Sequence, residues 1–128
     1  MVAARKRQFS VAIVDDDAGV RAAIQSLLES NGFRCWAFSS AEQFLRSRRG
    51  TKAACLILDL RLLGMSGLQL HCALQAKGLT IPVIFVTAED DAKEQLAHAP
   101  ALAVLHKPFD SEELLRLVRL AAEAPGTR

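Results

Sequence analysis

The stretch Cys55-Leu56-Ile57-Leu58-Asp59-Leu60-Arg61, continued by Leu62-Leu63-Gly64-Met65-Ser66-Gly67, decides the fold. Residues 54–58 form a short apolar run without polar alternation, which is typical of a strand buried on both faces of a parallel sheet. The carboxylate of Asp59 ends this run, and ligands of open α/β sheets bind beyond the carboxyl ends of the strands. A single aspartate at such a place is usually only a loop or capping residue. Its meaning therefore depends on the residues that end the other strands.

Along the whole chain, short apolar runs alternate with segments whose apolar residues have helical spacing. We expect further strands over residues 9–14, 33–38, 82–86 and 101–105. Helical patterns cover residues 18–30, 68–77 and 90–97, and a last helix begins after a cap at Asp110 or Ser111. One more helix follows Ser39 and Ser40, since Ser39-x-x-Glu42 and Ser40-x-x-Gln43 both have capping-box spacing. We expect Gly50-Thr51-Lys52 to break that helix.

Five strands that alternate with five helices predict an α/β fold, a doubly wound five-stranded parallel sheet with helices on both faces. A chain of 128 residues, 51% of them hydrophobic and 23% charged, fits a single globular domain of this kind. We expect the domain to span residues 9–123. Residues 1–8 are expected to be a disordered lead-in, and residues 124–128 a tail or the start of a linker.

The charge balance and the cysteines exclude several classes of function. A net charge of +2 is too small to indicate a nucleic-acid-binding protein. The basic runs at residues 5–7 and 46–52 are therefore interpreted as solvated surface. The three cysteines lack metal-ligand spacing and are expected to be reduced thiols. No apolar stretch approaches the roughly 20 residues that span a bilayer, so we expect a cytoplasmic protein without membrane contact.

Polar side chains follow four of the five predicted strands. They are Asp15 and Asp16 after the first strand, Asp59 after the third, Thr87 after the fourth and Lys107 after the fifth. Because the carboxyl ends of parallel strands share one edge of the sheet, these groups should converge. Carboxylates held close repel one another, so such a cluster favours a bound cation, and its hard oxygen ligands suit Mg²⁺. The lysine and the threonine hydroxyl could then hold phosphoryl oxygens.

With these residues the chain resembles the receiver domain of bacterial two-component response regulators, the CheY-like fold. The motifs that carry the resemblance are Ile13-Val14-Asp15-Asp16-Asp17, Leu58-Asp59-Leu60-Arg61 with Met65-Ser66-Gly67, Val86-Thr87-Ala88 and Lys107-Pro108-Phe109. Residues 32–33 and 39–45 are most similar to the FixJ-type branch, whose members usually carry a helix-turn-helix output domain. The resemblance implies the strand order 2-1-3-4-5.

The resemblance also implies a role for each of these residues. Asp59 would be the phosphoacceptor, and Asp15, Asp16, Asp59 and the backbone carbonyl of Arg61 would bind Mg²⁺ or Mn²⁺. Thr87 would be the switch hydroxyl, Lys107 would pair with the phosphoryl group, and Pro108 is a candidate for a cis peptide bond. Ala88, Arg61 and Glu89 would flank the phosphoryl group.

The partners that the family implies are a sensor histidine kinase and, through the fourth helix, fifth strand and last helix, a second copy of the chain. DNA would be bound only by a separate output domain.

Three features depart from the family pattern. Leu63 replaces the usual proline in the loop after the phosphoacceptor, and Val104 replaces the aromatic switch residue. The separation of Thr87 and Lys107, 107 − 87 = 20 positions, is about two shorter than usual. None of the three departures affects a residue of the phosphorylation chemistry. All three lie between the phosphoacceptor and the output surface that the resemblance implies.

Two other functions fit parts of the pattern. A degenerate receiver could serve as a phosphorylation-independent interaction module, although all five chemical positions are intact. Asp15-x-Asp17 resembles the nucleophile motif of haloacid-dehalogenase-type phosphatases, but Gly19 stands where that family has Thr or Val. We therefore expect a phosphoacceptor switch and not a turnover enzyme. His71, His98 and His106 are expected at the surface or at strand edges, not as phosphodonors.

Overall fold

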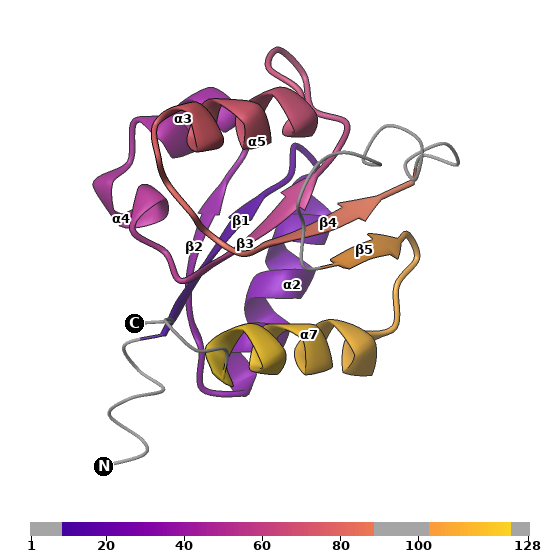
Figure 1. The fold of residues 1–128 in the computed structure, drawn as a ribbon. Coiled ribbons are helices and arrows are strands. Elements are labelled where there is room, and N and C mark those ends of the chain that lie inside the picture. Colours follow the sequence, from indigo (N-terminus) through magenta and orange to yellow (C-terminus); the bar gives the residue numbers. More distant parts are fainter. Residues whose placement is uncertain (1–8, 89–102, 124–128) are drawn as a thin grey trace.

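The computed structural model describes residues 9–88 and 103–123, which form a five-stranded parallel sheet in the order β2-β1-β3-β4-β5. The strands are β1 (Ser10–Val14), β2 (Arg34–Phe38), β3 (Cys55–Asp59), β4 (Val83–Thr87) and β5 (Ala103–His106). The helices are α2 (Ala18–Ser30), α3 (Ala41–Leu45), α4 (Arg48–Thr51), α5 (Gly67–Ala76) and α7 (Ser111–Glu123). The predicted fold class and strand order are confirmed (Figure 1).

Each strand of the sheet sends alternate residues to two separate cores. Val11, Ile13 and Ile57 belong to a core shared with α2 and α7, whereas Ala12 and Leu58 belong to one shared with α3 and α5. Figure 1 shows α2 and α7 on one side of the sheet and α3 and α5 on the other. Because both faces are covered, β3 and β4 are buried at every position, which explains why their sequences are apolar up to their last residues, Asp59 and Thr87.

The helices begin where side chains satisfy the free backbone amides of the first turn. The Asp17 carboxylate accepts hydrogen bonds from the amides of Gly19 and Val20, so α2 begins at the predicted residue. α5 begins with a capping box between Ser66 and Gln69, which the sequence reading did not identify. At the start of α7, Asp110 accepts a hydrogen bond from the amide of Glu112, 2.9 Å away.

The prediction for residues 39–52 was wrong in two respects. The helix that begins after Ser40 ends at Leu45, and Gly50 lies inside the second short helix, α4, instead of breaking the first. Gly50 is buried, and a Cβ atom there would lie 2.9 Å from the rings of Phe38 and Phe44. The glycine is therefore explained by close packing. Of the two predicted caps, Ser40 does cap α3 through the Gln43 amide, whereas the Glu42 side chain accepts a hydrogen bond from the distant Met65 amide.

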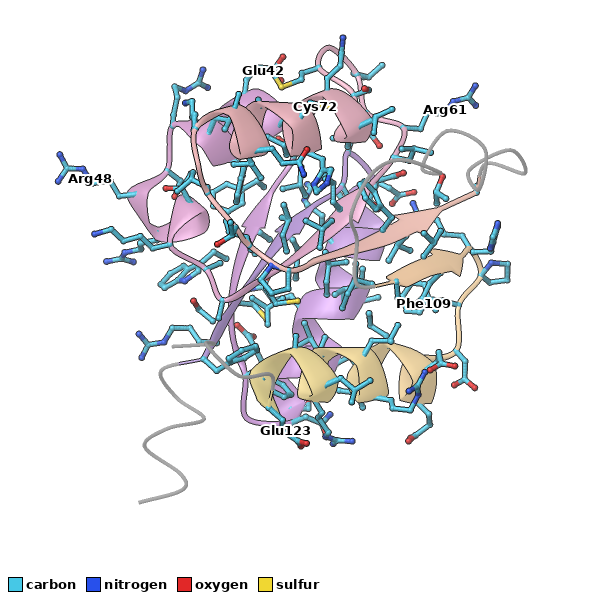
Figure 2. All side chains as sticks on the ribbon, in the orientation of Figure 1. Glu42, Arg48, Arg61, Cys72, Phe109 and Glu123 are labelled. Carbon is cyan, nitrogen blue, oxygen red and sulfur yellow. The ribbon has the colours of Figure 1, made fainter. Side chains whose placement is uncertain are left out.

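The expected position of one histidine was also wrong. His71 is buried on α5, because it lies beside Leu70 on the helix face that covers the sheet, and its ring meets the Phe85 ring edge-on at 5.8 Å. His106 is exposed at the end of β5, as expected. The basic residues of α4 are exposed, with Arg48 projecting from the molecule in Figure 2 and Arg49 stacked 4.7 Å from the Trp36 ring.

Several expectations fall on residues outside the described ranges. They are the lead-in at 1–8, the tail at 124–128, the helix at 90–97, and the positions of Glu89 and His98. Within the described ranges, no helix combines the length and apolarity that crossing a membrane requires.

All three cysteines are free thiols, as predicted, but their surroundings differ. Cys35 and Cys55 are buried, and burial is the main cause that raises the pKa of each thiol to about 12. Cys72 is exposed on the outer side of α5 (Figure 2).

We expect one thiol per chain to react with a disulfide reagent such as Ellman's reagent in the native protein at pH 8. With a pKa of about 12, roughly one in ten thousand Cys35 or Cys55 groups is a thiolate at that pH, and the thiolate is the reactive form. Cys72→Ser should abolish the fast native reaction, and unfolding in urea should release all three thiols of the wild type. Fast labelling of Cys35 or Cys55 in the folded state would contradict the burial of these residues.

Candidate functional site

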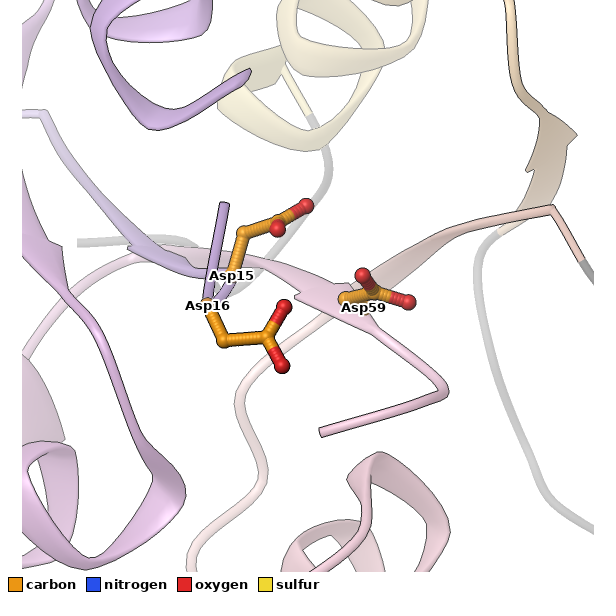
Figure 3. Close-up of side chains that lie close together, drawn as sticks. All are labelled: Asp15, Asp16 and Asp59. Carbon is orange, nitrogen blue, oxygen red and sulfur yellow. The ribbon is translucent and has the colours of Figure 1, made fainter. Parts of the chain in front are cut away.

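Three carboxylates meet at the carboxyl edge of the sheet. Asp15 directly follows β1, and Asp59 is the last residue of β3, which pairs with β1 through Val14 and Leu58. One oxygen from each of Asp15, Asp16 and Asp59 lies within 4.8 Å of the other two (Figure 3). Asp15 and Asp59 are buried and Asp16 is exposed, so the cluster is open on one side.

Lys107 directly follows β5, the outermost strand of the sheet, and its side chain reaches back to this cluster. Its Nζ donates to Oδ2 of Asp15 and to Oδ2 of Asp59, each at 2.9 Å. The lysine follows β5, two strands away from β3, and the Lys107–Pro108 peptide bond is cis, as the resemblance predicted. Its side chain is 21% exposed, against 3% for Asp15 and 7% for Asp59. The ammonium therefore lies between the buried carboxylates and the solvent.

Backbone amides orient the two buried carboxylates. The Asp17 amide donates to Oδ1 of Asp15 at 2.9 Å, and the Arg61 amide donates to Oδ1 of Asp59 at 3.0 Å. These bonds and those from Lys107 use one acceptor site on each of the four oxygens. An ionised carboxylate offers about four lone-pair sites, so each group can accept a further partner without losing its present ones.

The electrostatics of the site reflect a balance between burial and pairing. Burial raises the pKa of Asp59, and the negative charge of Asp15 adds to that effect, while the Arg61 amide and Lys107 oppose it. Burial would lower the pKa of Lys107, but its hydrogen bonds to Asp15 and Asp59 and their negative charges raise it above its ordinary value. The lysine is therefore an ammonium at neutral pH, and burial, more than the charge of Asp15, keeps the pKa of Asp59 above its ordinary value despite this pairing.

The cluster has the donor set of a hard divalent cation. Its three carboxylates are close enough to share one ion, and carboxylate oxygens are the ligands that Mg²⁺ prefers. A cation would also remove the repulsion that burial makes costly. The residues present therefore fit Mg²⁺ or Mn²⁺.

The other predicted residues lie in β4 and β5 or in the segments that follow β3 and β4. Thr87 is buried at the end of β4, opposite His106 of β5, and its backbone carbonyl accepts a hydrogen bond from the Lys107 amide at 2.9 Å. Ala88 is exposed, and the side chain of Arg61 projects away from the sheet (Figure 2). Val104 of β5 lies opposite Phe85.

The sequence analysis did not predict two contacts of the loop after Asp59. A Cβ atom on Gly67 would lie 2.2 Å from the Asp59 carbonyl oxygen, so only glycine lets α5 begin there. The Glu42 carboxylate accepts a hydrogen bond from the Met65 amide at 3.1 Å, across 23 positions of sequence. The glycine of the Met65-Ser66-Gly67 motif is a signal that could have indicated the first contact, but no local pattern pairs Glu42 with Met65.

Comparison with known proteins agrees with this geometry. Residues 11–119 match the response regulator receiver domain. The chain belongs to the response regulator receiver family. It is 40% identical to the response regulator protein TodT of Pseudomonas putida over 125 residues, which are 95% of this chain and 55% of TodT.

Solved receiver structures superpose closely on this chain. The structure of FixJ-N has a TM-score of 0.81 at 30% identity, with 91% of this chain and 95% of that one covered. The response regulator StyR has a TM-score of 0.79 at 37% identity, with 89% and 59% covered. The likeness to FixJ confirms the predicted branch, and this receiver chain spans about half the length of the curated relatives it matches.

We expect Asp59→Asn to raise the free energy of unfolding of the metal-free protein at pH 7. The gain should be about 1 kcal/mol, the low end for unit charges about 4 Å apart, because Lys107 already offsets part of the repulsion. Since the fold raises the pKa of Asp59, its ionisation destabilises the folded state at neutral pH, and protonation removes this penalty as the pH falls. The advantage of the variant should therefore shrink towards acid pH.

Urea unfolding in the presence of EDTA, at several pH values, measures this effect. Glu29→Gln removes an exposed carboxylate of α2 and serves as the control, for which a change within about 0.5 kcal/mol is expected. A variant less stable than the wild type at pH 7 would show that the ion pair with Lys107 outweighs the repulsion.

Proposed function

We propose that residues 9–123 form a phosphoacceptor domain that takes a phosphoryl group from a sensor histidine kinase onto Asp59, with Mg²⁺ or Mn²⁺ bound by Asp15, Asp16, Asp59 and the Arg61 carbonyl. One observation carries the proposal: the buried Asp59 carboxylate lies beside two other carboxylates and is held by the ammonium of Lys107. This arrangement combines a nucleophile, a cation site and a fixed positive charge at the same strand edge.

The proposed reaction requires little covalent chemistry from the protein. An oxygen of Asp59 attacks phosphorus, the bond from phosphorus to the imidazole nitrogen of the kinase breaks, and the imidazole departs with that electron pair. When bound, the cation supplies positive charge between the carboxylates and the incoming phosphoryl group. Lys107 is fixed within reach of Asp59 beforehand, so it can pair with phosphoryl oxygens without reorganisation. Hydrolysis by water later regenerates the carboxylate, which makes the domain a switch.

The output step is proposed to start at Thr87 and Val104. The hydroxyl of Thr87 would turn towards a phosphoryl oxygen, and Ala88 would leave room beside it. In place of an aromatic ring, Val104 offers a β-branched side chain with one dominant rotamer, so it transmits little by rotation. We also expect residues 88–100 to change mainly in order on activation, and these residues lie almost entirely outside the described ranges.

The remaining partners follow from the family and are proposals for this chain. A second copy would bind through the surface of β5 and α7, where Leu120 is 46% exposed between charged residues. Arg61 and Glu89 would flank the phosphoryl group and govern its exposure to water. DNA binding would belong to an output domain, and the domain would act in the cytoplasm. No observation favours the phosphatase or the phosphorylation-independent module.

We expect acetyl phosphate to phosphorylate the protein only when Mg²⁺ or Mn²⁺ is present, and Asp59→Asn to abolish the modification. The reason is that an anionic donor cannot approach three carboxylates unless a cation lies between them. Intact-mass spectrometry with and without EDTA measures the adduct. The matched control is Asp17→Asn, which removes a neighbouring carboxylate but keeps a good capping side chain for α2. An adduct that persists in Asp59→Asn, or that ignores EDTA, would refute the assignment.

We expect Mg²⁺ to stabilise the wild type by about 2.7 kcal/mol at 100 times its dissociation constant. Asp16→Asn should reduce this gain at the same Mg²⁺ concentration, because it removes one of the proposed ligands. Thermal or urea unfolding against Mg²⁺ concentration measures the linkage. If Asp16→Asn left the Mg²⁺ response unchanged, Asp16 would not be a ligand.

A further inference from the structure

The loop that joins Asp59 to α5, residues 60–66, is held firmly at its base. The Gly67 amide donates to the Leu60 carbonyl at 2.9 Å, and the Arg61 amide donates to Asp59 Oδ1 at 3.0 Å. Gly67 lies so close to the Asp59 backbone that a Cβ atom there would be 2.2 Å from the Asp59 carbonyl oxygen. The two ends of the loop are therefore fixed relative to the carboxylate cluster.

The tip of the same loop consists of Leu63 and Gly64, which lie between Leu62, a residue buried in the core shared by α3 and α5, and the partly buried Met65. Leu63 is 81% exposed and so buries almost no apolar surface. Gly64 has a φ of +77°, and no proline restricts the chain at these two positions. Flexible residues of this kind lose more conformational entropy on ordering than proline does.

Glu42 of α3 supplies a contact at this tip. Its carboxylate accepts the Met65 amide at 3.1 Å, and a Cβ atom on Gly64 would lie 3.0 Å from Glu42 Oε2. Hydrogen bonds from its own backbone amide and from that of Met65 lower the pKa of Glu42, so it is ionised at neutral pH and accepts strongly. The loop tip therefore lies against a charged acceptor from a different helix.

The helix that carries Glu42 is itself well anchored. Ser40 caps α3 through the Gln43 amide at 3.1 Å. Phe44 is fully buried and meets the Phe38 ring edge-on at 5.6 Å. Because these contacts fix α3, the hydrogen bond from the Met65 amide to Glu42 holds the loop in place relative to that helix.

We propose that Glu42 is a positioning residue for the cation site: through the Met65 amide it holds residues 60–66 in the conformation that presents the Arg61 backbone carbonyl at the strand edge. The assignment of that carbonyl as a ligand rests on the proposed function. Glu42 itself does not touch the reacting atoms. Its effect is to reduce the number of loop conformations that must be lost when the cation binds.

The first test follows the amide of Met65 by hydrogen exchange in the metal-free protein. Glu42→Ala should speed this exchange about tenfold, which corresponds to about 1.4 kcal/mol. Glu42→Gln keeps an acceptor oxygen and should retain most of the protection. Gln43→Ala is the matched control, because Gln43 lies next in the same helix and its side chain bonds only to Ser39 among the described contacts.

The second test measures the dissociation constant of Mg²⁺ by calorimetry on the same variants. Glu42→Ala should weaken Mg²⁺ binding about threefold to tenfold. This is less than the roughly 10–100-fold loss that is typical when a residue hydrogen-bonded directly to a metal-ligating side chain is replaced. Glu42→Gln should bind nearly as the wild type does. If Glu42→Gln bound Mg²⁺ as weakly as Glu42→Ala does, the loss of the Glu42 charge alone would explain the lower affinity, and the positioning role would be wrong.

A second pair of variants perturbs the tip without removing Glu42. Gly64→Ala places a Cβ against Glu42 and should weaken Mg²⁺ binding and speed Met65 exchange. Gly78→Ala is its control, because Gly78 has a φ of +74° and nothing within 4 Å of a Cβ. Both variants place an alanine at a positive φ and so carry similar backbone strain. Only Gly64→Ala lies in the loop beside Glu42, so only this variant should change the loop. Equal effects of the two on Mg²⁺ binding would overturn the proposal.

Failure of this inference differs from failure of the proposed function. If the wild type binds Mg²⁺ and none of the Glu42 variants changes the affinity, Glu42 has no positioning role while the cation site stands. If the wild type does not bind Mg²⁺ at all, both proposals fall, whatever the exchange rate of Met65.

Discussion

The structure depends on how one lysine and three carboxylates share the carboxyl edge of the sheet. Lys107 pairs with Asp15 and Asp59 at once, and this ammonium is the positive charge that makes their burial tolerable. One lysine cannot neutralise three carboxylates, so the edge keeps a net negative charge that a divalent cation can satisfy. The lysine thus offsets part of the repulsion, and the remaining negative charge favours binding of a cation.

The strand order is what makes this arrangement possible. β1 and β3 are neighbours although β2 lies between them in the sequence, and this crossover places Asp15 and Asp59 side by side. Lys107 lies beyond β5, and its long side chain spans the distance back to β3. β3 and β4 are apolar except for Asp59 and Thr87, their last residues, so the polar groups of these strands are concentrated at the carboxyl edge of the sheet.

The loop after Asp59 connects the chemistry to the rest of the domain. Its base is constrained by Gly67 and its tip is held by Glu42, two contacts from different helices on the same face of the sheet. On the other side of the site, Val104 packs beside Phe85 and lacks the ring through which relatives are expected to transmit the signal. The proposed output step therefore relies on the position of backbone segments more than on the rotation of a large side chain.

The sequence by itself determined the parallel sheet and the polar residues at the strand ends, because hydrophobic periodicity and strand-end chemistry are local properties. The strand order and the cis bond before Pro108 were predicted from the resemblance to the receiver family. The sequence did not determine where α3 ends, that Gly50 packs beneath two phenylalanine rings, or that His71 is buried. It also gave no sign that Glu42 bonds to Met65 and not within its own helix. These features depend on contacts between segments far apart in the chain, and such contacts are decided only when the helices pack on the sheet.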